Sequence, residues 1–208
     1  MKYKVIFLDW NKTLNHDRFF GHWQIENPSF YNAIQERLFT PQSARIHRWM
    51  RGQHRSEEIL EFVSEFIHLP KHVLLAELRK SCEAMTLVDP RILHYTEKAR
   101  SVGTRIVIAT DNMDTFTRWT VPALKLYNYF DDVLNSYDLG VLKKDLTEKG
   151  ELAFFESYLK KHQLKPNECV MVDDGAKLGL ILQSAGMDFR LVDAEHSAFH
   201  HLQSLVTE

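Results

Sequence analysis

Short runs of apolar residues alternate with segments of helical periodicity along much of this chain. Apolar runs that are bounded by turn residues are typical of buried strands in a parallel sheet. The sequence predicts such strands at residues 4–8, 105–109, 132–135 and 169–172, with a fifth candidate at 189–192. Between these strands, apolar side chains recur at helical spacing in residues 92–102 and 154–162, which predicts two helices. Strands that alternate with helices imply βαβ units, so the predicted fold class is α/β with a Rossmann-like parallel sheet.

A long segment without a convincing strand separates the first two predicted strands, at about residues 15–88. Apolar positions recur at helical spacing in 59–67, behind the N-cap candidate Ser56, and again in 74–85. Two more helices are expected on either side of Pro41. Because a structureless loop of this length would be improbable in a compact domain, the segment is predicted to be a helical insertion.

Three aromatic residues, Phe19, Phe20 and Trp23, crowd the start of this segment. Two interpretations stay open at this point. The rings either close the hydrophobic core of the insertion, or some of them line a substrate pocket, because apolar rings dominate ligand sites.

The composition narrows the class of protein. A chain of 208 residues with 44% hydrophobic residues fits one domain with a modest insertion. The net charge of −2 favours neither a nucleic-acid partner nor an acidic membrane surface. No apolar run approaches the ~20 residues that span a bilayer. The distant cysteines Cys82 and Cys169 are expected to be buried thiols, and this low cysteine usage fits a cytoplasmic protein.

Polar side chains follow the predicted strands at the points where those strands end. Taken singly, each has an ordinary explanation as a helix cap or turn residue. Ligands of open α/β sheets, however, bind outside the carboxyl ends of the strands. A carboxylate, a hydroxyl, a lysine and an acidic pair at one such edge suit a metal-bound phosphoryl group. The candidates are Asp9, the loop Thr110-Asp111-Asn112, Lys143 and the pair Asp173-Asp174.

In these residues the chain resembles the haloacid dehalogenase superfamily of phosphotransferases. The nucleophile motif of that family, D-x-D-x-[TV], corresponds to Asp9-Trp10-Asn11-Lys12-Thr13, and Thr110, Lys143 and Asp173-Asp174 match its other three motifs in order. The resemblance covers nearly the whole chain. It implies a Rossmann-like catalytic core at 1–14 and 89–208, and an inserted α-helical cap of the family's first type at 15–88.

The resemblance also implies a role for each carboxylate. Asp9 would be the nucleophile that forms an aspartyl-phosphate. Mg²⁺ would be held by the Asp9 carboxylate, the backbone carbonyl of Asn11 and the Asp174 carboxylate. Asp173 would act as a water-mediated or outer ligand.

The remaining motif residues are expected to hold the phosphoryl group of a small phosphorylated substrate. Thr110 would donate a hydrogen bond to a phosphoryl oxygen, with Asp111 and Asn112 in the same loop. Lys143 would neutralise the developing charge and keep Asp9 ionised.

Asn11 departs from the family pattern, because phosphatases of the superfamily carry a second Asp there that protonates the leaving group. An amide cannot transfer a proton, and general acid–base help typically contributes ~10²–10⁴-fold. The sequence therefore predicts a Mg²⁺-dependent phosphatase-like hydrolase of low or specialised activity, suited to acyl or aryl phosphates.

Two alternatives stay open: a catalytically silent member that binds a phospho-ligand or a protein, and a dehalogenase-like hydrolase acting at carbon. Dehalogenases of the family carry Tyr at this position and lack an acidic pair like Asp173-Asp174.

Overall fold

The computed structural model describes residues 2–40 and 43–207 and is built around a five-stranded parallel sheet. The strand order is β3-β2-β1-β4-β5, so the first strand lies in the middle of the sheet. The strands are β1 (Val5–Leu8), β2 (Arg105–Thr110), β3 (Asp132–Asn135), β4 (Cys169–Asp173) and β5 (Asp188–Leu191). All five strand predictions are confirmed, with ends that move by no more than one residue. The α/β fold class is therefore also confirmed.

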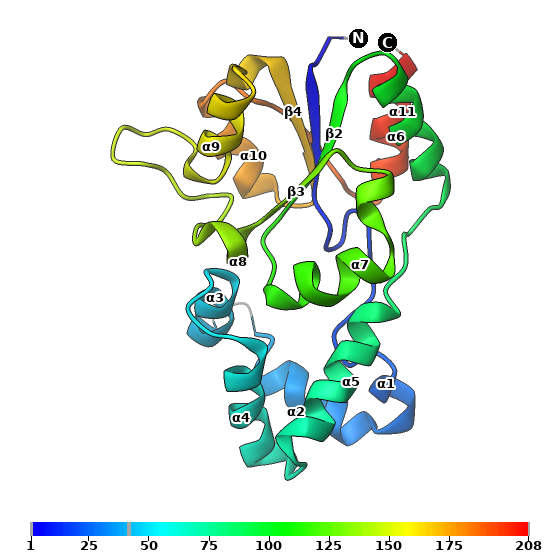
Figure 1. Ribbon diagram of the computed structural model, residues 1–208, viewed down its shortest axis with the longest axis vertical. Coiled ribbons are helices and arrows are strands. Elements are labelled where there is room, and N and C mark those ends of the chain that lie inside the picture. Colours follow the sequence, from blue (N-terminus) through cyan, green and yellow to red (C-terminus); the bar gives the residue numbers. More distant parts are fainter. Residues whose placement is uncertain (1, 41–42, 208) are drawn as a thin grey trace.

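Helices cover both faces of the sheet (Figure 1). On one face lie α6 (Arg91–Ser101) and α11 (Ala198–Thr207), and on the other lie α9 (Ala153–Lys161) and α10 (Ala176–Ser184). The side chains of β1 alternate between the two layers. Ile6 and Leu8 pack in the cluster that contains α6 and α11, whereas Val5 and Phe7 pack against α9. This burial on both faces explains why β1 is apolar without interruption.

Shorter helices connect these elements. They are the π-helix η1 (Phe116–Thr120), α7 (Val121–Ala123), the 3₁₀ helices η2 (Leu126–Asn128) and η3 (Pro166–Glu168), and α8 (Ser136–Leu139). The segment from η1 to α7 lies at the carboxyl edge of the sheet, next to the helices that follow β1 (Figure 1).

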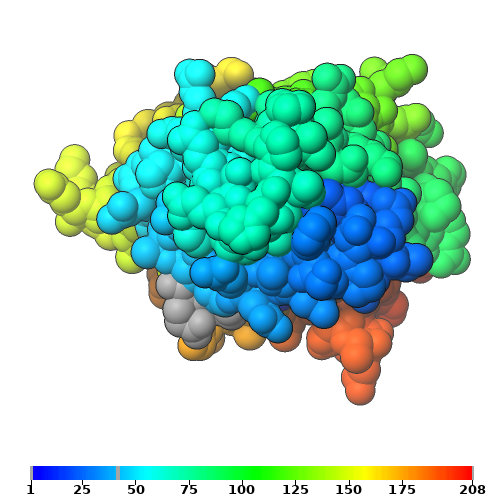
Figure 2. All heavy atoms as spheres, turned by 90° about the horizontal axis from the view of Figure 1, so that it is seen from below, coloured from blue at the N-terminus to red at the C-terminus, as the bar shows by residue number. Residues whose placement is uncertain are grey.

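Residues 15–40 and 43–88, called the helical insertion below, lie beyond this carboxyl edge, while both ends of the chain lie at the opposite end (Figure 1). The helices are α1 (Trp23–Glu26), α2 (Pro28–Arg37), α3 (Ala44–Met50), α4 (Ser56–Ile67) and α5 (Lys71–Glu83). The predicted helices are confirmed, although Pro41 lies outside the described residues. Figure 2 views the molecule from this end, and the insertion fills most of that face.

The helical insertion has a hydrophobic cluster of its own, centred on side chains such as Ile34, Trp49 and Leu78. Met113 and Trp119, which follow β2, join this cluster and connect the insertion with the sheet-bearing part of the chain. Of the aromatic residues at its start, Phe20 and Trp23 are buried in the cluster, whereas Phe19 is half-buried.

Ser56 differs from its predicted role as a helix N-cap. The helix α4 begins at Ser56, and the preceding residue, Arg55, is the N-cap. The Glu58 carboxylate accepts a 2.7 Å hydrogen bond from the Arg55 backbone N–H. The Ser56 hydroxyl instead donates to the Asp114 carboxylate at 2.7 Å. A hydroxyl that is used in a buried tertiary contact is not available to cap its own helix.

Two smaller expectations can also be compared with the structure. Cys82 and Cys169 are buried free thiols, as predicted. Within the described residues, no helix combines the length and the hydropathy needed to cross a lipid bilayer.

Candidate active site

Asp9 lies directly after β1 at the centre of the sheet's carboxyl edge. Its backbone N–H donates to the Val172 carbonyl at 3.0 Å, so the residue still belongs to the sheet ladder. The chain then turns sharply, because the Trp10 carbonyl accepts from the N–H groups of Leu14 and Asn15, both at 2.9 Å. Lys12 adopts the left-handed backbone conformation in this turn. The turn leaves the Asp9 carboxylate at the edge and directs the chain into the helical insertion.

The Lys143 ammonium joins the ends of β1 and β4. Its Nζ lies 2.7 Å from Oδ1 of Asp9 and 2.5 Å from Oδ2 of Asp173. The contact with Asp173 is a hydrogen bond, whereas the contact with Asp9 is an ion pair without hydrogen-bond geometry. All three side chains are buried. Two carboxylates around one ammonium leave a net negative charge in a buried place, which calls for a further cation.

Asp174 completes an acidic cluster at this edge. Carboxylate oxygens of Asp9, Asp173 and Asp174 lie within 4.8 Å of one another. Asp174 is half-buried, and its only nearby cation among the described residues is Lys12, at 3.8 Å. Three carboxylates in this arrangement form a set of hard oxygen ligands of the kind that Mg²⁺ prefers.

Burial and the neighbouring charges act on these groups in opposite directions. Burial raises the pKa of the Asp9 carboxyl, and the Lys143 ammonium opposes that rise. Burial alone would lower the pKa of Lys143, but the carboxylates of Asp9, Asp173 and Asp111 raise that pKa above its ordinary value. Lys143 therefore stays cationic and favours the ionised form of Asp9, but burial prevails and the pKa of Asp9 stays raised, at about 7.

The turn after β4 depends on a glycine. The Gly175 backbone N–H donates to Oδ1 of Asp173 at 2.7 Å, which fixes the carboxylate. A Cβ at this position would lie 2.9 Å from that same oxygen. Such a contact is shorter than side chains tolerate, so residue 175 must be glycine for Asp173 to keep its orientation.

The loop after β2 contains the residues predicted to hold phosphate. Thr110 is fully buried, and its hydroxyl has no hydrogen-bond partner within the described residues. Oδ1 of Asp111 accepts from the Lys143 backbone N–H at 2.9 Å, so it fixes the loop that carries the lysine. Oδ1 of Asn112 accepts from Met113 N–H at 2.9 Å, and the Asn112 N–H donates to the Ser136 hydroxyl at 3.0 Å. Only Thr110 in this loop presents a buried polar atom that is still unsatisfied.

Sequence reasoning missed two polar contacts that hold the helical insertion next to this edge. Asp114, which is 2% exposed, accepts from Trp49 and Ser56 of the insertion and from Arg118. Arg51 of the insertion forms a bidentate ion pair with Asp145, with one contact of 2.9 Å. Asp145 belongs to the loop that carries Lys143, and it also accepts from the Leu142 N–H at 2.8 Å. The only local signal was the i,i+4 spacing of Asp114 and Arg118.

A hollow of about 650 Å³ lies between the insertion and the carboxyl edge, and Asn11 is in its wall. This volume is in the range of small-molecule sites. Its lining also includes Arg18, Phe19, Gln35 and Phe39 from the helical insertion. Phe19 is therefore a pocket residue, while its neighbour Phe20 belongs to the core.

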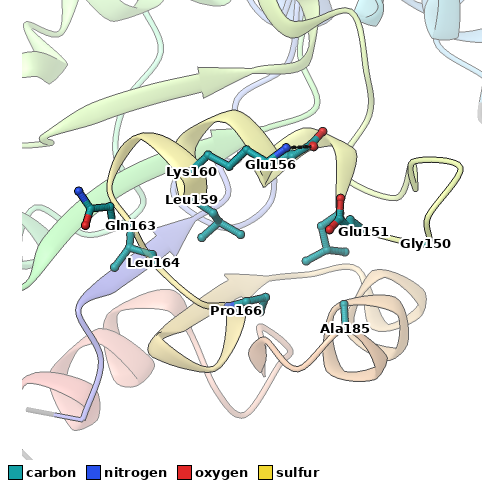
Figure 3. A pocket seen from close by; sticks show the side chains of 10 residues that line it. Gly150, Glu151, Glu156, Leu159, Lys160, Gln163, Leu164, Pro166 and Ala185 are labelled. Atoms are coloured by element: carbon teal, nitrogen blue, oxygen red, sulfur yellow. Dashed lines mark hydrogen bonds and ion pairs between the residues drawn. The ribbon is translucent and has the colours of Figure 1, made fainter.

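A second hollow, of about 360 Å³, lies away from this edge between α9, the end of α10 and Pro166 at the start of η3 (Figure 3). Apolar side chains such as Leu159 and Leu164 line it, and its Lys160 and Glu156 pair with each other. The acidic cluster and Lys143 line neither of these two hollows. Together with Asp111 and Gly175 they line a third one, of about 270 Å³.

Comparison with known proteins identifies the family. A family model described as haloacid dehalogenase-like hydrolase matches residues 3–186, which is most of the chain. This chain belongs to the haloacid dehalogenase-like hydrolases. A comparison with curated proteins finds no match.

Solved structures of haloacid dehalogenase-like (HAD) proteins share the fold of this chain. A predicted HAD-like family hydrolase from Porphyromonas gingivalis aligns with a TM-score of 0.73 and 17% identity over 100% of both chains. A HAD family enzyme from Bacteroides thetaiotaomicron, crystallised with magnesium and inorganic phosphate, aligns with a TM-score of 0.68 and 15% identity, over 94% of this chain and 96% of that one. A HAD phosphatase from Thermococcus onnurineus aligns with a TM-score of 0.58 and 19% identity, over 91% and 86%.

Proposed function

We propose that this chain is a Mg²⁺-dependent phosphohydrolase that acts through an aspartyl-phosphate on Asp9. The observation that carries the proposal is the buried ion-pair chain from Asp9 through Lys143 to Asp173, with Asp174 beside it. The chain's membership in a hydrolase family agrees with this chemistry. So do the magnesium and phosphate bound by the Bacteroides enzyme of the same fold.

The residues present fit a magnesium ion. Asp9, Asp173 and Asp174 supply carboxylate oxygens within 4.8 Å of one another, and the buried group of two carboxylates and one ammonium is short of positive charge. In our proposal Asp9, Asp174 and the Asn11 carbonyl hold the ion directly, and Asp173 acts through a water molecule or from outside. When bound, Mg²⁺ would neutralise the phosphoryl group and align it with Asp9.

The chemistry of the chain's own residues follows from their positions. A carboxylate oxygen of Asp9 attacks phosphorus, and the bond between phosphorus and the leaving oxygen breaks with its electron pair on that oxygen. Water then attacks the same phosphorus, the Asp9 carboxylate leaves, and inorganic phosphate is released with the proton passing to solvent. Splitting one displacement into two in this way lowers each barrier.

Lys143 and Thr110 would stabilise the charge that develops on the phosphoryl oxygens. The Lys143 ammonium is held between two carboxylates and is already desolvated, so it needs no reorganisation during the reaction. The unsatisfied Thr110 hydroxyl would donate to a phosphoryl oxygen. Asp111 and Asn112 would support these two groups by fixing their loops, rather than by binding the substrate themselves.

Asn11 would set the substrate range. It lies two residues after Asp9 and is in the wall of the larger hollow. We infer that the leaving group of a phosphate bound at Asp9 extends past Asn11 into this hollow. An amide can donate a hydrogen bond there but cannot supply a proton. We therefore infer an enzyme that is slow on alkyl phosphates and faster on phosphates whose leaving oxygen needs no protonation. The helical insertion, as a cap, would contact the rest of the substrate.

The test is a panel of phosphorylated compounds that spans alkyl, aryl and acyl phosphates, assayed with Mg²⁺ and with EDTA. We expect turnover that requires Mg²⁺ and favours aryl and acyl substrates. Absence of turnover for every phosphate would support a silent ligand-binding member of the fold. Hydrolysis of a haloacid that survives EDTA would support carbon chemistry instead.

A further inference from the structure

The larger hollow has chemical features that go beyond a general phosphate-ester site. Phe19 and Phe39 form a stacked pair in its wall, with ring centroids 5.4 Å apart and an interplanar angle of 17°. Both rings are half-buried, so each retains surface that faces the hollow. Flat aromatic surfaces of this kind favour an aromatic ring as the neighbouring group.

Two buried polar atoms of this hollow lack a partner within the described residues. They are Oδ1 of Asn15 and Nε2 of Gln35. Asn15 is 1% exposed, and its Nδ2 is already used, since it donates to Asp17 and to the Thr86 carbonyl. Buried polar atoms are normally paired in folded proteins, so orphaned atoms in the wall of a hollow indicate a ligand that satisfies them.

The charges of the hollow favour an anion. Arg18 is exposed in its wall, and its guanidinium forms no ion pair with a carboxylate in the part of the chain that the structure describes. The wall also contains the carboxylate of Asp17, whose Oδ2 accepts from Asn15 Nδ2, Thr86 N–H and the Thr86 hydroxyl, and the ammonium of Lys12, so its cationic side chains outnumber its carboxylate. The Arg18 guanidinium and Gln35 Nε2 together offer donors that suit a carboxylate or a similar anion.

We propose that the substrate is an aryl phosphate whose ring carries a second anionic group, with the ring against Phe19 and Phe39 and the anion at Arg18. This inference rests on the proposed function and gives it a substrate class. It also explains how Asn11 is tolerated, because a phenolate leaves without protonation. The leaving-group chemistry at Asn11 and the residues that line the hollow therefore indicate the same kind of molecule.

The test compares two aryl phosphates of nearly equal shape, 4-carboxyphenyl phosphate and 4-carbamoylphenyl phosphate. The carboxyphenyl ester carries an additional anionic group on its ring, whereas the carbamoylphenyl ester is neutral at that position. We expect the native enzyme to favour the carboxylate by about tenfold in kcat/KM, as a charge-assisted contact predicts. We expect Arg18→Gln to remove this preference through KM, with kcat nearly unchanged.

Arg48→Gln is the matched control, because Arg48 is an exposed arginine of the same insertion that does not line the hollow. This variant should keep the native preference. No preference in the native enzyme, a preference that survives Arg18→Gln, or an equal loss in Arg48→Gln would each overturn the inference, while turnover of the two esters would leave the proposed function intact.

A binding measurement separates failure of this inference from failure of the proposed function. Calorimetry with Mg²⁺ and inorganic phosphate present compares 4-hydroxybenzoate with 4-hydroxybenzamide. Tighter binding of the acid that is lost in Arg18→Gln supports the anion site even if neither ester is hydrolysed. Equal binding of the two compounds, or no binding of either, overturns it.

Discussion

The indole N–H of Trp49, in the helical insertion, donates a 2.7 Å hydrogen bond to Oδ1 of Asp114, which follows β2. Ser56 donates to the same oxygen at 2.7 Å, and Arg118 donates to Oδ2 at 2.6 Å. Asp114 is 2% exposed, so this is a buried carboxylate with both oxygens satisfied. Together with the ion pair of Arg51 and Asp145, it fixes the insertion against the edge that carries the acidic cluster.

Replacing Asp114 tests how much this contact stabilises the fold. In Asp114→Asn, an amide NH₂ group replaces one carboxylate oxygen and faces N–H or O–H donors instead of accepting from them. Arg118 also loses one of its two carboxylate partners. We expect the free energy of unfolding to fall by about 3 kcal/mol, as for other broken buried charge networks. Urea denaturation measures this change in the free energy of unfolding. Glu36→Gln, which removes an exposed carboxylate, is the control, and a similar small change in both variants would contradict the account.

Arg51→Gln tests whether the ion pair between Arg51 and Asp145 positions the loop that carries Lys143. The pair is partly solvated, so its loss should change the free energy of unfolding by less than about 1 kcal/mol. We expect kcat/KM for an aryl phosphate to fall by about tenfold, because the Lys143 loop loses an anchor and small misplacements are costly in catalysis. Arg48→Gln should show neither change. Unchanged kinetics in Arg51→Gln would mean that the insertion does not influence the loop.

Lys143→Gln separates a charge role from a structural one. Without the ammonium, the group of Asp9, Asp173 and Asp174 becomes more negative, so the apparent affinity for Mg²⁺ should rise. Turnover should nevertheless fall by about 10²-fold or more, because a donor aimed at the phosphoryl charge is lost. Magnesium titration followed by intrinsic fluorescence, together with steady-state kinetics, measures both. A general structural defect would lower both quantities, and that result would refute the charge role.

Asn11→Asp restores a group that can transfer a proton. General acid–base help contributes ~10²–10⁴-fold, so we expect at least about a tenfold rise in turnover of a generic aryl phosphate. The gain should be larger for an alkyl phosphate, whose leaving oxygen needs the proton more. Steady-state assays on both substrates provide the comparison. If neither rate rises, the missing acid–base group is not what limits turnover.

The sequence allowed good prediction of the sheet and of the edge at which Asp9, Asp173 and Asp174 lie, while their roles stay predictions. Strands such as β1 and β4 are buried on both faces, so their uninterrupted apolar runs are visible in the chain itself. Asp9 and Asp173 mark the ends of those runs. The carboxyl ends of parallel strands share one edge, and this is why their proximity could be expected.

The contacts that hold the insertion could not be predicted in the same way. Trp49 and Asp114 are 65 positions apart, and no local pattern relates an indole to a carboxylate over such a distance. The same applies to Arg51 and Asp145. The division of roles between Asp173 and Asp174 also stays a prediction, since both lie in the acidic cluster while only Asp173 pairs with Lys143.

The most direct measurement of the central claim is mass spectrometry of the protein after acid quench during turnover of an aryl phosphate. We predict one added phosphoryl group on the peptide that contains Asp9, formed with Mg²⁺ and absent with EDTA. Asp9→Asn should show neither this adduct nor hydrolysis while it keeps the native fold. Full hydrolysis by Asp9→Asn, or a phosphoryl group on a different residue, would contradict the account.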